Sequence, residues 1–263
     1  MRWIFLSITL IACGETSGFW KSTVTPTGSA EQNYQYGLRE LKDSNYQLAE
    51  QYFRYVKSNF GYSRWAIPSD LGLCDVDFGR EKYIEAIEGY RQFIKLHPKN
   101  ERVIDGYVEF RIAESYYKQI PSDWFMSPPA YEKDQGPVLD AERELGTFVE
   151  AHRDSAYYTR AKDLLSETIR RLTDHELFVA RYYLDHDRPL AAIGRLEGIV
   201  QEYPFAKREP ETLLLLGKTY LKMKKNEEAK RTFEKLQADH PDDFRAVKAR
   251  LYLDYIAKQA HKS

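Results

Sequence analysis

The sequence predicts an all-α protein built from repeated helix pairs. One observation is a pattern that returns along most of the chain: a small residue, an Ala twelve positions later, and an aromatic residue or Leu four positions after that Ala. A second is the Pro that follows the Ala by a further twelve positions in three of the copies and ends a helix there. A third is the stretch from Asp154 to His186, which has helical apolar spacing and no Pro or Gly. Self-similarity of this kind indicates a stacked array.

The pattern is that of the tetratricopeptide (TPR) repeat, in which small residues let the two helices of a pair approach closely. The last copy is nearly ideal, with Gly217, Ala229, Phe233 and Pro241. In the other three uninterrupted copies the small residue and the Ala are Gly37 and Ala49, Cys74 and Ala86, and Ala180 and Ala192. We therefore predict a TPR-type α-solenoid of five helix-pair repeats, closed by a capping helix over 243–259 that shields the open end of the core.

The third repeat is interrupted. Its two alanines, Ala113 and Ala141, are twenty-eight positions apart, so an insert over 120–137 separates its helices. Four prolines forbid a continuous helix there, yet the insert carries large apolar side chains. Either these side chains fill a gap on the surface of the array, or they anchor a partner. The candidate partner-binding residues are Trp124, Phe125 and Met126, with Tyr131 nearby.

The start of the chain resembles a lipoprotein signal. Arg2 and an apolar run lead into Leu10-Ile11-Ala12-Cys13-Gly14. The apolar stretch is far shorter than the ~20 residues that span a bilayer. We expect a signal peptide over 1–12, acylation (palmitate among the chains) at Cys13, and a flexible tether over 13–29. The alternatives are an ordinary secretory peptide or a disordered terminus with a chance Cys.

Two halves are expected after the tether: repeats 1–3 over 30–153, and repeats 4 and 5 with the capping helix over 154–263. Composition limits the function of both. The 39 basic and 40 acidic side chains give a net charge of −1, which supplies no general attraction to nucleic acid. Cys74 lies at a position where a small residue packs between helices, and we interpret it as a core thiol.

No catalytic or metal-binding motif is recognisable. The sequence lacks HExxH, GxSxG and a P-loop, and three of its six histidines stand at expected helix ends. The nearest approach to a catalytic cluster, Asp185-His186-Asp187, falls at the turn inside the fourth repeat, where a solvated turn is expected. We predict a protein that is not an enzyme, with no catalytic residue, metal or cofactor.

Several short motifs occur in an order that resembles one family, the outer-membrane assembly lipoproteins of the BamD type. The resemblance covers essentially all of the chain after the signal, and five TPR repeats behind a lipobox are similar in number and order. The motifs are Phe93-Ile94-Lys95-Leu96-His97-Pro98, Val103-Ile104-Asp105-Gly106-Tyr107, Asp134-Gln135-Gly136-Pro137, and Arg195-Leu196-Glu197-Gly198 followed by Tyr203-Pro204.

The resemblance implies a lipid-anchored scaffold on the periplasmic face of the outer membrane, within the β-barrel assembly machine. Its C-terminal repeats would bind the BamA POTRA domain nearest the barrel, with Arg195 and Glu197 on that side. Its N-terminal repeats would receive unfolded outer-membrane proteins or other lipoproteins of the complex. The chain departs from the family at Gly61-Tyr62 and in the linker 63–70 with Trp65 and Pro68, where clients or accessory subunits would lie.

Two other functions stay open at this point. The chain could be a TPR lipoprotein of the pilotin class, which assists secretin or pilus assembly, although such arrays are usually regular. It could also be an enzyme whose site has no known motif. In the scaffold interpretation the concave side of the array holds an extended or helical peptide without a change of fold, and N-terminal tyrosines such as Tyr34 and Tyr52 supply rigid contacts.

Overall fold

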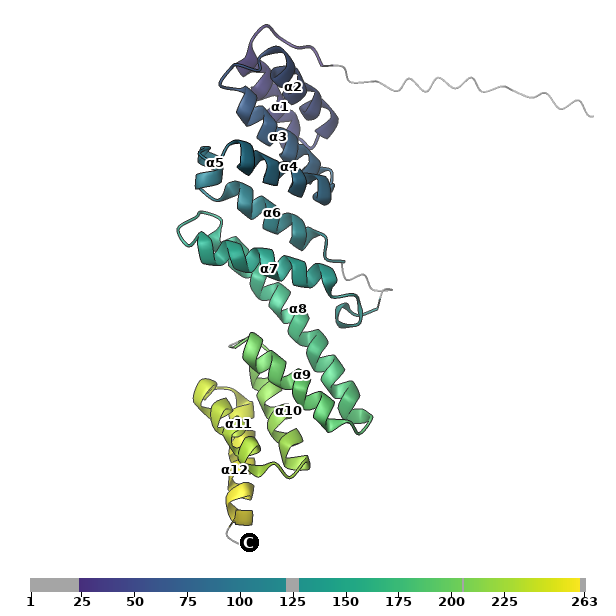
Figure 1. The fold of residues 1–263 in the computed structure, drawn as a ribbon, viewed down its shortest axis with the longest axis vertical. Coiled ribbons are helices and arrows are strands. Elements are labelled where there is room, and N and C mark those ends of the chain that lie inside the picture. Colours follow the sequence, from purple (N-terminus) through teal and green to yellow (C-terminus); the bar gives the residue numbers. More distant parts are fainter. Residues whose placement is uncertain (1–23, 122–127, 205, 261–263) are drawn as a thin grey trace, which may run out of the picture. The chain divides into compact units, whose positions relative to one another are not determined.

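A computed structural model describes residues 24–121, 128–204 and 206–260, and every long element in these ranges is an α-helix (Figure 1). The elements are α1 (Ala30–Lys42), α2 (Tyr46–Asn59), α3 (Ala66–Gly79), α4 (Tyr83–Leu96), α5 (Glu101–Ile104), α6 (Tyr107–Lys118), the short 3-10 helix η1 (Ala130–Glu132), α7 (Gly136–Ala151), α8 (Tyr158–Asp185), α9 (Pro189–Glu202), α10 (Glu209–Lys222), α11 (Asn226–Asp239) and α12 (Phe244–Ala260). The prediction of an all-α array of helix pairs is confirmed. No helix within the described ranges is long and apolar enough to cross a membrane.

The chain divides into two compact units, Met1–Leu73 and Cys74–Ser263. In the first unit, the Phe53 ring of α2 is fully buried and lies against two glycines. A Cβ atom on Gly37 of α1 would fall 2.6 Å from this ring, and one on Gly72 of α3 would fall 2.7 Å from it. The small residues expected from the repeat pattern therefore admit an aromatic side chain into the space between helices.

The second unit repeats this arrangement. A Cβ atom on Gly217 of α10 would fall 2.4 Å from the buried Phe233 ring of α11, and one on Gly89 of α4 would fall 2.9 Å from the Cys74 sulfur. Cys74 is buried, as the interpretation as a core thiol requires. The alanines of the pattern (Ala86, Ala141, Ala180, Ala192 and Ala229) have no exposed surface.

Four of the turns that join the helices of a pair share one backbone conformation. Ser44, Glu81, Asp187 and Lys224 have φ values of 62°, 61°, 52° and 58°. In each turn the next N–H bonds a carbonyl five residues back, as from Lys225 to Tyr220 at 3.0 Å. This is the Schellman geometry, which satisfies carbonyls at the end of a helix. The same turn joins α1 to α2, α3 to α4, α8 to α9 and α10 to α11, so the backbone conformation repeats along with the sequence pattern.

The predicted long helix is present, but it is shorter at its start than the sequence suggested. α8 covers Tyr158–Asp185, so the expected beginning at Asp154 is wrong. Residues before it form a turn in which Ser155 accepts a hydrogen bond from the Tyr157 N–H at 3.2 Å and donates one to the Asp105 carbonyl at 2.7 Å. Ser side chains form such local hydrogen bonds in competition with the helix. The spacing of apolar residues does not reveal these bonds, so it predicted too early a helix start.

A second correction concerns the linker expected over 63–70. α3 begins at Ala66, so Pro68 lies in its first turn. Pro is compatible with a first turn because the N–H it lacks would have no partner inside the helix. Trp65 directly precedes α3 and stacks on Tyr34 of α1 with ring centroids 5.1 Å apart.

A largely buried polar network connects α3, α4 and α6. The Asp75 carboxylate accepts hydrogen bonds from the hydroxyls of Tyr90 at 2.6 Å and Tyr107 at 2.7 Å, and the Arg111 guanidinium lies 3.7 Å away. Burial raises the pKa of Asp75, against the opposing effect of Arg111 and the two hydroxyls, and it also raises the pKa of Tyr90. Hydrogen bonds require defined distances and angles, so the network fixes the positions of α3, α4 and α6 more narrowly than apolar contacts would.

Candidate partner-binding groove

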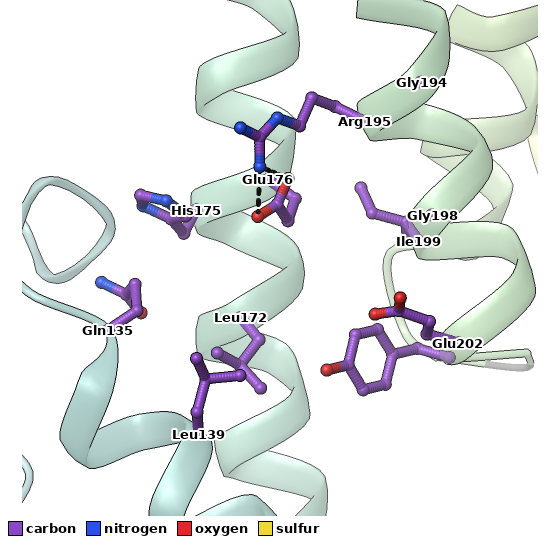
Figure 2. A pocket seen from close by; sticks show the side chains of 11 residues that line it. Gln135, Leu139, Leu172, His175, Glu176, Gly194, Arg195, Gly198, Ile199 and Glu202 are labelled. Atoms are coloured by element: carbon purple, nitrogen blue, oxygen red, sulfur yellow. Dashed lines mark hydrogen bonds and ion pairs between the residues drawn. The ribbon is translucent and has the colours of Figure 1, made fainter.

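A groove around the sequence-predicted site residue Arg195 lies where α7, α8 and α9 meet (Figure 2). Its volume is about 370 Å³. The lining side chains come from the start of α7, the middle of α8 and one face of α9, and they are Gln135, Leu139, Leu172, His175, Glu176, Gly194, Arg195, Gly198, Ile199, Glu202 and Tyr203. Three of them, Arg195, Gly198 and Tyr203, belong to the motif that begins at Arg195.

An ion pair spans one end of the groove. The Arg195 guanidinium on α9 donates to both carboxylate oxygens of Glu176 on α8, at 3.3 and 3.2 Å (Figure 2). The Arg195 side chain is 47% exposed and that of Glu176 is 28% exposed. A pair this open to water contributes little to stability, about 0–1 kcal/mol. Its guanidinium therefore stays accessible to a carboxylate from outside.

Two glycines leave part of the α9 wall without side chains. A Cβ atom on Gly194 or Gly198 would meet no atom within 4 Å, so packing inside the chain does not require glycine at either position. Glycine inside a helix costs about 0.5–1 kcal/mol relative to Ala. The two residues are one turn apart and flank Arg195, and their effect is to keep the groove open beside the guanidinium.

The other end of the groove is acidic. Burial and the nearby carboxylates of Glu142, Glu202 and Glu176 raise the pKa of Tyr203 to about 12. Burial and the charge of Glu202 likewise raise the pKa of Glu142. The groove thus has the Arg195–Glu176 ion pair at one end and further carboxylates at the other, an arrangement that suits a polar partner with charges of both signs.

The described part of the insert forms one edge of the groove. The Nδ1 atom of His175 lies 2.6 Å from the Tyr131 carbonyl oxygen, and the Tyr131 ring lies 4.9 Å from that of Phe178 on α8. Gln135 donates to the Ala130 and Lys133 carbonyls at 3.0 and 2.7 Å. Its Oε1 atom is buried without a hydrogen-bond partner among the described residues. Tyr131 therefore packs on the array itself, whereas Trp124, Phe125 and Met126 lie outside the described residues.

Arg195 and Glu197 do not act together. Glu197 points to the opposite neighbour, α10, where its carboxylate accepts a hydrogen bond from the Tyr220 hydroxyl. Burial and this bond raise the pKa of Tyr220. The two residues are two positions apart on a helix, which directs their side chains to different faces. Glu197 thus holds α9 to α10, and Glu176 is the carboxylate that faces Arg195.

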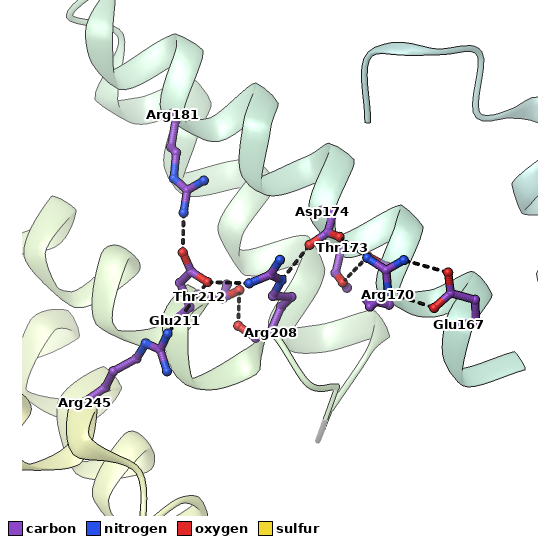
Figure 3. Close-up of polar contacts among 9 residues, drawn as sticks. All are labelled: Glu167, Arg170, Thr173, Asp174, Arg181, Arg208, Glu211, Thr212 and Arg245. Carbon is purple, nitrogen blue, oxygen red and sulfur yellow. Dashed lines mark hydrogen bonds and ion pairs between the residues drawn. The ribbon is translucent and has the colours of Figure 1, made fainter. Parts of the chain in front are cut away.

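A second charged surface runs across α8, α10 and α12 (Figure 3). Arg208 donates to Asp174 at 2.6 Å and to Glu211 at 3.2 Å. Arg181 also pairs with Glu211, and Arg170 bonds Asp174 at 2.7 Å. The arginines drawn in Figure 3 all have carboxylate partners from the chain itself, so this surface ties the first helices of successive repeats together.

The remaining predicted features have simpler outcomes. Cys13 lies outside the described residues. The cluster around His186 is an exposed turn, in which Asp187 pairs with Lys222 of α10 at 2.9 Å. Within the described ranges, no three His, Cys, Asp or Glu side chains are grouped so that they could hold a metal ion.

Sequence reasoning missed Glu176, Gly194 and the groove itself. Glu176 is nineteen residues from Arg195 and on another helix, so only the packing of α8 on α9 brings them together. The glycines were a usable signal in the sequence. Two glycines one turn apart lower the stability of a helix, so their presence indicates that another group must approach the helix backbone closely.

Comparison with known proteins points in one direction. A family model described as "Outer membrane lipoprotein" (YfiO) matches residues 26–236. The protein "Outer membrane protein assembly factor BamD" of Caulobacter vibrioides is 30% identical over 210 residues, which are 80% of this chain and 66% of that protein. The protein of the same name from Neisseria meningitidis serogroup A is 25% identical over 245 residues, 90% of each chain. Among solved structures, the TPR2AB domain of yeast Sti1 in complex with pHSP90 has a TM-score of 0.43 and 12% identity, covering 89% of this chain and 86% of that one.

Proposed function

Because the chain belongs to the BamD (YfiO) family of outer membrane lipoproteins, we propose that it is a non-catalytic scaffold of the β-barrel assembly machine. In this proposal Cys13 carries the lipid that anchors the protein to the periplasmic face of the outer membrane. The C-terminal repeats hold the POTRA domain of BamA, and the N-terminal repeats receive unfolded outer-membrane proteins or other lipoproteins of the complex.

The single observation that supports a BamA site here is the half-exposed Arg195 at the rim of a groove whose α9 wall is opened by Gly194 and Gly198. A carboxylate of the partner would replace Glu176 as the acceptor of the Arg195 hydrogen bonds. Arg binds carboxylates in a planar, two-pronged geometry, so the exchange keeps the charge and adds orientation. Gly194 and Gly198 would let a backbone segment of the partner approach α9.

Client binding by the N-terminal repeats is supported by the aromatic side chains of the first unit. Its exposed aromatic surface includes Tyr62, and Arg64 lies over the Trp65 ring at 4.7 Å. Rigid aromatic side chains give contact area at small entropic cost, which suits the capture of an extended peptide. The pilotin alternative receives no comparable support, since the two curated relatives compared above are both named assembly factors.

The decisive test is co-purification from native membranes. We expect Arg195→Glu to reduce the amount of BamA recovered with the full-length lipoprotein by tenfold or more, because a buried interfacial charge of the wrong sign costs several kcal/mol. Helicity by circular dichroism should be unchanged. Arg91→Glu is the matched control, since Arg91 is 53% exposed and pairs with Glu144 on another helix at 3.3 Å.

A second variant separates the groove from the charge. Gly198→Leu leaves Arg195 in place but fills the open α9 wall, and we expect it to weaken BamA recovery as well. Full recovery of BamA with both variants would refute this site. Recovery of a secretin or pilus protein in place of BamA would refute the assembly role.

A further inference from the structure

One face of the closing helix α12 is apolar and uncovered. Phe244, Val247, Leu251 and Tyr255 are 59%, 67%, 67% and 54% exposed. Their spacing of three, four and four residues places them within an arc of about 80° on a helix with 3.6 residues per turn. The opposite face, which includes Ala249 and Ile256, is buried in the core formed with α10 and α11.

The array needs an apolar side chain at only two of the four stripe positions. The turns that lead into α10 and α12 share one hydrogen bond, because the Glu209 N–H bonds the Ala206 carbonyl as the Ala246 N–H bonds the Asp243 carbonyl, and this bond aligns the two helices. With that shift of thirty-seven residues, the four stripe positions correspond to Lys207, which precedes α10, and to Pro210, Leu214 and Lys218 within it. Pro210 is buried and Leu214 packs against the core, whereas the two lysines are replaced by the aromatic residues Phe244 and Tyr255 in α12.

The stripe is also not a vacant place for another helix of the array. Leu213 and Gly217 are buried residues of α10, and Gly217 packs directly on α11. Their counterparts in α12 are Arg250 and Asp254, both exposed. Charges at these two positions oppose the docking of an apolar helix in the way that α11 docks on α10, so the stripe beside them has a different role.

Basic residues flank the stripe. α12 carries four basic side chains and one acidic one, in a chain whose net charge is −1. The Lys248 ammonium lies 5.0 Å from the centre of the Phe244 ring, and the Arg245 guanidinium, which also pairs with Asp243, lies 4.5 Å from it. Exposed Lys248, Arg250 and Lys258 lie beside or within this arc of the helix, and the Lys248 charge lies over the Phe244 ring.

We propose that this face of α12 is a membrane contact that binds the surface of an anionic phospholipid bilayer. Phe244, Val247, Leu251 and Tyr255 enter the boundary between headgroups and acyl chains, and the lysines contact lipid phosphates. An apolar stripe with Lys and Arg beside it is the composition of helices that lie in a bilayer surface. This contact goes beyond the proposed scaffold function and does not depend on it.

The size of the stripe favours lipid over protein. A helix of seventeen residues is about 25 Å long, and a stripe one or two side chains wide along it falls well below the ~800 Å² that each partner buries in a stable protein interface. Interfacial binding to a bilayer has no such threshold, because each inserted side chain and each cation adds its own contribution.

The test uses the full chain with Cys13→Ser, so that no acyl chain is attached. Flotation is measured with vesicles of phosphatidylglycerol and phosphatidylethanolamine, and with vesicles of phosphatidylcholine alone. We expect binding to the anionic vesicles that weakens with salt. Leu251→Ser with Tyr255→Ser should weaken it about tenfold or more. Lys248→Glu with Lys258→Glu should weaken it by at least about fivefold per charge.

The matched control is Ile104→Ser with Leu190→Ser, because these side chains are 70% and 64% exposed and lie on other helices. All variants keep the apolar residues 1–12, so differences between them report on α12 alone. Equal flotation of stripe and control variants would overturn the proposal. A second pair of results would also overturn it: the chain fails to bind anionic vesicles, and the stripe variants lose a protein that the parent chain retains from native membranes. Those results would make α12 a protein-docking surface.

Discussion

Arg195 on α9 holds the Glu176 carboxylate of α8 by both oxygens, and the pair lies open to solvent at the rim of a groove. We expect the charge swap Arg195→Glu with Glu176→Arg to restore the ion pair and leave the free energy of unfolding within about 0.5 kcal/mol of that of the parent chain. Association with BamA should remain lost, because the partner carboxylate would now meet a like charge. Recovery of BamA by the swapped protein in pull-down would show that Arg195 acts only through Glu176.

Gly217→Ala should destabilise the last repeat. A Cβ atom there would stand 2.4 Å from the Phe233 ring, which is fully buried and has no space to yield. Overpacking of this kind costs about 1–3 kcal/mol, more than the helix propensity that Ala adds. Thermal unfolding followed by circular dichroism measures the change. Gly146→Ala is the control, since a Cβ there meets nothing within 4 Å and should stabilise α7 by up to about 1 kcal/mol.

Tyr90→Phe should cost about 1–3 kcal/mol of stability, because it removes one of two hydroxyls that bond the largely buried Asp75 carboxylate. The ring itself is fully buried and would remain in place. Urea titration of the two proteins gives the difference. Tyr62→Phe, at a fully exposed ring, should change the midpoint hardly at all. Equal midpoints for both variants would mean that the network contributes nothing.

The raised pKa of Tyr203 predicts that the free energy of unfolding falls at alkaline pH. Its pKa is about 12 in the folded chain, against 10 for an ordinary tyrosine. Between these values the unfolded chain loses the proton while the folded chain keeps it, so the unfolding free energy falls as pH rises through that window. Tyr203→Phe should remove this part of the loss. Urea titrations at pH 9 and pH 11 measure it, with the exposed Tyr182→Phe as the comparison; an unchanged pH dependence in Tyr203→Phe would contradict it.

The repeats were predictable because their pattern depends on local geometry. A small residue such as Gly217 and an aromatic such as Phe233 meet whenever two helices of a pair are joined by a short turn, so a fixed spacing carries the contact. Cys74 was placed correctly for the same reason. The beginning of α8 was missed because Ser155 forms bonds that compete with helix, and apolar spacing does not record them.

The groove was only half predictable. The motif that begins at Arg195 pointed to α9, but it grouped Arg195 with Glu197, whose side chains leave opposite faces of the helix. The residue that pairs with Arg195 inside the chain is Glu176, and this contact forms only because α8 packs against α9. Long-range contacts of this kind follow from tertiary structure and have no sequence spacing of their own.

The length of α8 has a consequence for how the second unit unfolds. Its first half packs in the core around Leu145 and Phe148, and its second half packs in the core around Leu196 and Leu213. Elsewhere the chain turns between consecutive helices, and an array can fray one repeat at a time at such turns. A continuous helix of 28 residues offers no joint between the two cores. Amide hydrogens along the middle of α8 should therefore exchange with solvent only in openings that involve both cores, which makes α6 to α12 a single cooperative unit.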